Sequence, residues 1–83
     1  MAKVKHNGYD GYIYSYKEVS FVVWNGSPNT KGDWYASIEH SNGLNFSERE
    51  LDFHYPLKST TKAIMENVID NAIYRQPKHE NIA

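Results

Sequence analysis

The sequence predicts an α+β fold, in which a small antiparallel sheet of three to five strands carries one C-terminal amphipathic helix on one face. Three stretches rich in aromatic and β-branched residues come first, as strands favour: Gly11–Tyr16, Val19–Trp24 and Trp34–His40. One stretch with helical spacing, Ser59–Gln76, follows them. Because 83 residues can bury only one core, we expect a single domain over residues 1–77 and a flexible tail at 78–83.

The first strands differ in pattern. Gly11–Tyr16 alternates, which places Tyr12, Tyr14 and Tyr16 on one face. Val19–Trp24 is nearly all apolar, which indicates a central strand covered on both faces. The intervening Lys17 and Glu18 include neither glycine nor asparagine, so a two-residue turn would be unusual there and one bent strand is the alternative. Lys3–His6 is either an edge strand or a frayed end.

Turn-forming residues separate the next elements. Asn25–Asp33 contains Pro28 and two glycines, which predicts a long exposed hairpin loop. Trp34–His40 alternates as a strand, and Asn42–Gly43 is a second hairpin signal. Leu44–Phe46 could then pair back as a short fourth strand.

Residues 47–55 carry two conflicting signals. Ser47 and Glu50 have the spacing of a capping box, which favours a helical turn. Leu51, Phe53 and Tyr55 alternate with polar residues, which favours a strand. We prefer a strand from Glu50 to Tyr55, because Pro56 disfavours a helical backbone at the preceding residue.

The final element is a helix with Ser59 or Thr60 as its N-cap. Pro77 lies just beyond its end, as expected for a helix stop. Its apolar stripe is formed by Met65, Val68, Ile69, Ala72 and Ile73.

Composition excludes several classes of protein. The chain has no cysteine, so disulfides and thiolate zinc sites are absent and we expect a reducing, cytoplasmic location. Its net charge is −1, with nine basic and ten acidic residues, which gives no broad attraction to duplex DNA or anionic lipid. No window approaches the roughly 20 apolar residues of a membrane span, so we expect no membrane partner.

The sequence also lacks the signatures of catalysis. It has no nucleophile elbow and no phosphate-binding loop, and its four histidines lack the close pairing of a zinc site. Glu50, Asp52 and His54 could bind a cation from one strand face, but a solvated polar face is the preferred interpretation. We therefore predict a protein that is not an enzyme and that has no cofactor and no metal.

Aromatic side chains are the best binding candidates. The tyrosines of Gly11–Tyr16 are either exposed for a partner or packed against the helix with their hydroxyl groups at its rim. The loop between the two tryptophans is a second candidate, since long loops often carry contacts. The predicted partner-binding residues are Tyr9, Tyr12, Tyr14, Tyr16, Trp24, Asn29, Lys31 and Trp34.

These features favour a binding or inhibitory protein that occludes a protein partner through a few aromatic anchors. In general character, a small, cysteine-free, aromatic-rich α+β chain resembles the accessory proteins of bacteriophages and mobile elements, including inhibitors of host defence such as anti-CRISPR proteins. The alternative is a module for single-stranded nucleic acid or RNA, which would stack bases on the tyrosines and hold phosphates with Lys3, Lys5, Lys17 and Lys31. A homodimer formed through strand edges is a third hypothesis.

Overall fold

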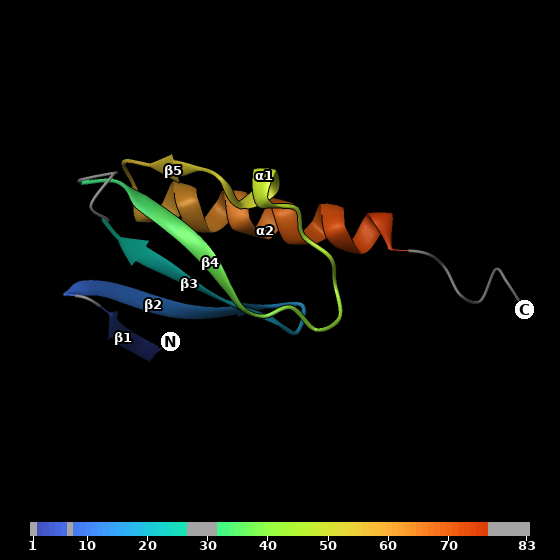
Figure 1. Ribbon diagram of the computed structural model, residues 1–83, viewed down its shortest axis with the longest axis horizontal. Helices are drawn as coiled ribbons and strands as arrows, with labels where there is room; N and C mark the ends of the chain where they lie inside the picture. Colours follow the sequence, from blue (N-terminus) through green and yellow to red (C-terminus); the bar gives the residue numbers. More distant parts are fainter. Residues whose placement is uncertain (1, 7, 27–31, 77–83) are drawn as a thin grey trace, which may run out of the picture.

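A computed structural model describes residues 2–6, 8–26 and 32–76 of the chain. They form one five-stranded antiparallel sheet whose strands lie in chain order, with the long helix on one face (Figure 1). The predicted α+β class is thus confirmed. Asn29, Lys31 and the tail at 78–83 lie outside the described residues. The elements are β1 (Ala2–His6), β2 (Tyr9–Tyr16), β3 (Val19–Asn25), β4 (Trp34–His40), α1 (Glu48–Leu51), β5 (His54–Tyr55) and α2 (Lys58–Arg75).

A two-residue turn joins β2 to β3. Its central residues, Lys17 and Glu18, have φ values of 50° and 67°. Positive φ at both central positions is what a type I′ turn requires, and its twist matches that of the flanking strands. The single bent strand considered from the sequence is therefore wrong. The antiparallel pairing of the two strands holds two non-glycine residues in a backbone region that they rarely adopt.

β3 lies at the centre of the sheet, as its apolar sequence predicted. Its side chains Val19, Phe21 and Val23 are fully buried against α2, from which Met65 and Ile69 enter the same core. Both described helices lie on this side of the sheet, because the core cluster joins them to alternate residues of β3 and β4. The helices therefore cover one face of β3. On its other face no described helix lies, and the Trp24 indole helps to bury Val22.

The segment after β4 differs from the prediction. Residues 44–46 are irregular and do not form a strand. Leu44 is instead buried in the core beneath α2, which leaves its backbone out of register with the sheet. The Asn42–Gly43 turn is present, with φ values of 54° and 80°, but it leads into this irregular segment rather than into a hairpin.

Residues 47–55 combine both of the signals seen in the sequence. The Ser47–Glu50 capping box is formed in both directions, and it begins the four-residue helix α1. The strand preferred from Glu50 to Tyr55 is wrong for its first part, since only His54 and Tyr55 pair with β4. The two reciprocal hydrogen bonds satisfy backbone donors locally and fix the helical turn.

α2 begins one residue earlier than predicted and has a different cap. Leu57 is the N-cap residue and gives no side-chain hydrogen bond, so neither Ser59 nor Thr60 is the cap. The buried Thr61 hydroxyl donates instead to two carbonyl oxygens, at 3.1 Å to that of Leu57 and at 3.2 Å to that of Trp34, and so ties the first turn of α2 to β4. Neither helix in the described part of the chain has the length and apolar content to cross a membrane.

Candidate functional site

The sheet has two chemically different faces, which follow from strand alternation and register. One face, here called the helix face, packs on α2 and carries the charged strand residues Lys3, Lys5 and Asp10. The opposite face, here called the open face, has no described helix on it. Its described side chains are Val4, Tyr9, Gly11, Ile13, Ser15, Ser20, Val22, Trp24, Tyr35, Ser37, His40 and His54.

Trp24 lies flat on the open face. A Cβ atom at Gly11 would lie 2.7 Å from the Trp24 ring and 2.7 Å from the Val22 side chain. Only glycine leaves the room for this approach between neighbouring strands. The Trp24 Nε1 group donates a hydrogen bond of 2.9 Å to the Ser37 hydroxyl on β4. The indole thus spans three strands, and it helps to bury Val22, which is 2% exposed.

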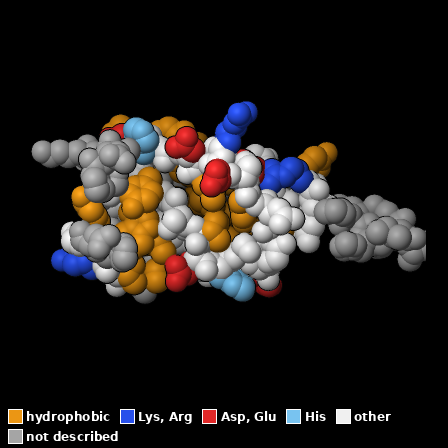
Figure 2. All heavy atoms as spheres, viewed as in Figure 1, with side chains coloured by type: hydrophobic (Ala, Val, Ile, Leu, Met, Phe, Trp, Pro, Cys, Tyr) orange, Lys and Arg blue, Asp and Glu red, His pale blue; other side chains and the backbone are white. Residues whose placement is uncertain are grey.

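Two tyrosines continue this aromatic surface at the same end of the sheet. The Tyr9 ring lies 3.7 Å from the point where a Cβ atom on Gly26 would be. Tyr35 of β4 lies opposite Trp24 of β3. Burial raises the pKa of the Tyr35 hydroxyl, and the nearby Tyr9 adds to this effect. In Figure 2 hydrophobic side chains gather where β3 ends and β4 begins, with charged side chains mainly around them.

None of the open-face residues is an aspartate, glutamate, lysine or arginine, and the two histidines lie on the last residue of β4 and on the edge strand β5, where His54 contacts Asp33 at 2.7 Å. The three charged residues of β1 and β2 point to the helix face, and Glu39 lies in the β-bulge that ends β4. The centre of a protein–protein interface is typically poor in charged residues and rich in tyrosine and tryptophan. This surface therefore has the chemistry to be buried against another protein.

Tyr12, Tyr14 and Tyr16 form a tyrosine stripe on β2. This stripe lies on the helix face, beside α2, and its rings are half-buried. The Tyr14 ring lies 5.8 Å from that of Phe21, and the Tyr12 ring lies 6.1 Å from that of Trp34. The Tyr16 hydroxyl donates to the Asp70 carboxylate at 3.0 Å. Two arrangements of these tyrosines were considered from the sequence, exposed for a partner or packed against the helix. The rings pack beside the helix, with their hydroxyl groups at its rim.

Lysine ammonium groups lie over the rings of this stripe. Lys58 of α2 places its Nζ atom 4.2 Å from the Tyr12 centroid, and Lys62 lies 5.1 Å from that of Tyr14. The stripe and these lysines, together with Lys3, Lys5 and Lys17, are called the tyrosine ledge below. Lys58 and Lys62 are four residues apart on α2, and this spacing places them over two successive tyrosines of β2.

Carboxylates partly neutralise the ledge. Lys17 is bonded to Asp70 at 2.7 Å, which raises the pKa of Lys17 and lowers the pKa of Asp70. Lys62 is paired with Glu66 at 2.7 Å, and Asp10 lies 3.7 Å from Lys3 and 3.8 Å from Lys5. Among the described residues Lys58 has no ion pair, so its contacts are with aromatic rings.

The cation site considered around Glu50, Asp52 and His54 is not formed. Glu50 belongs to α1 and bonds the Arg75 guanidinium, while the His54 ring contacts Asp33 at 2.7 Å. The described ranges hold no cluster of three or more histidine or acidic side chains that could bind a metal ion. Because the capping box places Glu50 in a helical turn, the three side chains do not share one strand face.

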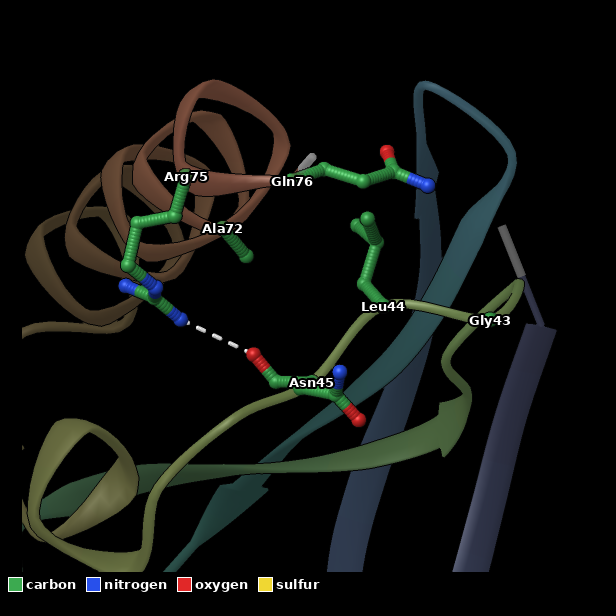
Figure 3. A pocket seen from close by; sticks show the side chains of 6 residues that line it. All are labelled: Gly43, Leu44, Asn45, Ala72, Arg75 and Gln76. Carbon is green, nitrogen blue, oxygen red and sulfur yellow. Dashed lines mark hydrogen bonds between the residues drawn. The ribbon is translucent and has the colours of Figure 1, made fainter. Parts of the chain in front are cut away.

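A small pocket lies between the irregular segment after β4 and the C-terminal end of α2 (Figure 3). Its volume is about 80 Å³, well below the roughly 300 Å³ of a typical small-molecule site. The Arg75 guanidinium closes one side by donating a 2.8 Å hydrogen bond to the Asn45 carbonyl oxygen. The hydrogen bond of Arg75 thus ties the C-terminal end of α2 to the segment after β4.

The predicted binding residues divide between the two faces. Tyr9 and Trp24 lie on the open face, whereas Trp34 and the tyrosine stripe lie on the helix face. Tyr35 and Gly11 belong to the open face but were not among the predicted binding residues. A glycine inside an aromatic strand was the available signal, because it often marks a close approach.

Comparison with known proteins gives no assignment. No protein-family model, curated protein or solved structure matches this chain at a significant level.

Proposed function

We propose that this chain is a small non-catalytic binding protein that inhibits a protein partner by covering it with the open face of the sheet. The observation that supports this best is the uncharged aromatic surface around Trp24, which no described helix covers. Desolvating such a surface has no cost of removing charges from water, and rigid aromatic side chains give large contact area at low entropic cost. Tyr9 and Tyr35 would be the anchors beside Trp24.

The partner belongs, in this proposal, to a host system, and the chain acts as an accessory inhibitor of a phage or mobile element. Its small size and lack of cysteine support this role, because such a protein must fold unaided in the reducing bacterial cytoplasm. Occlusion needs no catalytic group. It needs only a partner surface that is flat and low in charge, which matches the open face.

The test is capture of a partner by the intact chain and by a variant with a charge on the open face. Tyr9→Glu places a carboxylate at the margin of the aromatic surface, where its burial on binding would be costly. Tyr74→Glu is the matched control, since Tyr74 is 86% exposed on α2. Circular dichroism and urea unfolding establish that both variants keep the fold.

Immobilised protein is exposed to lysates from several bacterial hosts. We expect one stoichiometric protein to be retained by the wild type and by Tyr74→Glu, and to be lost with Tyr9→Glu. Addition of the chain should then reduce the activity of the purified partner in proportion to its occupancy. Retention that is unchanged in Tyr9→Glu, or a dimer in light scattering that Tyr9→Glu dissociates, would contradict the proposal, because the latter shows a second copy on the open face.

A further inference from the structure

The tyrosine ledge has a different chemistry from the open face. It combines half-buried tyrosine rings on β2 with five lysines, which come from three separate parts of the chain: Lys3 and Lys5 on β1, Lys17 in the turn, and Lys58 and Lys62 on α2. Three carboxylates face these lysines: Asp10, Glu66 and Asp70. The chain has a net charge of −1, yet the ledge has an excess of lysine over acid.

We propose that the ledge binds a single strand of nucleic acid, with bases on the tyrosine rings and phosphates on the lysines. Tyr12, Tyr14 and Tyr16 follow one another on one strand face at intervals of about 7 Å. An extended single strand can match this spacing between successive nucleotides. An acidic peptide would satisfy the lysines, but it has no flat groups to stack on the rings, so the nucleic acid is the better fit.

Binding would exchange one set of contacts for a stronger set. The lysines now lie over the rings, where an exposed cation–π contact is weak. A base stacked on an aromatic ring is held more strongly than such an exposed cation. The flexible lysine side chains can move from ring to phosphate while a base takes their place. Lys58 is the best placed to move, because no described carboxylate holds it.

Fluorescence anisotropy of a labelled deoxythymidine oligonucleotide tests the proposal at several salt concentrations. With about three lysine–phosphate contacts, the logarithm of the binding constant should fall with the logarithm of the salt concentration at a slope of about −2. Lys58→Gln combined with Lys62→Gln should weaken binding about tenfold and make this slope shallower by about 1.4, which is about 0.7 for each lost phosphate contact.

Arg49→Gln is the matched control. Arg49 belongs to α1, which lies beside β5 at the edge of the sheet opposite to β1 and β2 (Figure 1). We expect its binding to equal that of the wild type. Equal losses in Arg49→Gln and the double lysine variant would overturn the proposal, and so would an anisotropy that does not respond to salt.

Two further probes separate stacking from charge. Tyr12→Leu removes a ring at the margin of the core and should weaken binding severalfold at unchanged salt slope. An abasic oligonucleotide and an oligo-glutamate peptide of equal charge should both bind more weakly than oligothymidine. Equal binding of the peptide would show that the ledge recognises charge alone and would overturn the assignment. Tyr9→Glu leaves the ledge intact, so this test is independent of the proposed protein partner.

Discussion

Two residues of β2 and β3 determine what the open face looks like. Gly11 has no side chain, and this absence lets the Trp24 indole lie across the sheet and reach Ser37. With any larger residue the ring would have to turn away from the strand. A single glycine thus decides whether the aromatic surface is flat.

Gly11→Ala should destabilise the protein by about 1–3 kcal/mol, because its Cβ would overlap the Trp24 ring and the Val22 side chain. Urea unfolding measures the change. Ser15→Ala, at an exposed position on the same strand face, is the control and should have little effect. In a Trp24→Val background the cost of Gly11→Ala should shrink, and an undiminished cost would show that the ring is not the obstacle.

The turn at Lys17 and Glu18 stores backbone strain. Glu18→Gly at φ 67° should stabilise the protein by about 0.5–1 kcal/mol, since glycine adopts positive φ without a Cβ clash. Thermal and urea unfolding report the gain. Glu18→Ala removes the same charge but keeps the strain, so it should give no gain. Equal stabilisation by both variants would point to the charge instead.

At the scale of elements, one arginine connects three segments. Arg75 ends α2, donates to the Asn45 carbonyl oxygen and bonds the Glu50 carboxylate of α1 at 3.0 Å. Glu50 also completes the capping box with Ser47. Its pKa is lowered from the ordinary value near 4.5, first by the hydrogen bond from Arg75 and then by the Ser47 backbone.

This pairing makes stability depend on pH. Since folding lowers the pKa of Glu50, its contribution is present above about pH 4.5 and is lost as the pH falls through the folded-state pKa. Glu50→Gln should therefore cost about 0.5–1 kcal/mol at pH 7 and much less at pH 3, the modest size reflecting solvent screening. Glu48→Gln, which removes a carboxylate from the same helical turn but leaves the Arg75 pair intact, is the matched control. A cost for Glu50→Gln that is equal at both pH values would refute the assignment.

The whole molecule presents two surfaces of opposite character on the two sides of one sheet. The open face is aromatic around Trp24 and has no lysine, arginine or acidic side chain, and the tyrosine ledge is lined by lysines beside α2. Because the sheet lies between them, a ligand on one surface does not cover the other. The molecule could therefore hold a protein on one side and a nucleic-acid strand on the other.

Independence of the two surfaces is itself a prediction. Tyr9→Glu should abolish capture of the protein partner and leave oligonucleotide affinity within about twofold of the wild type. The double lysine variant, Lys58→Gln with Lys62→Gln, should show the reverse pattern. Isothermal titration with each ligand, alone and in the presence of the other, provides the measurement. A loss of both activities in either variant would mean that the two surfaces do not act separately.

Much of the fold could be predicted because its signals are local. Alternation identified β2 and β4, and the apolar run of Val19–Trp24 identified β3 and placed it at the centre. The errors came where two local signals competed, as in residues 47–55, or where a long-range contact decided the outcome. Lys17 and Glu18 illustrate the second case, since pairing of β2 with β3 imposes a turn that their own preferences disfavour.

The sequence by itself determined the order and type of the main elements and the division of strand residues into two sets. It could not determine which set faces α2, because alternation is symmetric until a helix covers one side. Only the tertiary structure placed Tyr9 and Trp24 on the open face and the tyrosine stripe beside Lys58 and Lys62. The contacts of Tyr12 with Lys58 and of Tyr14 with Lys62 join residues more than 40 positions apart, and the packing of the core decides them.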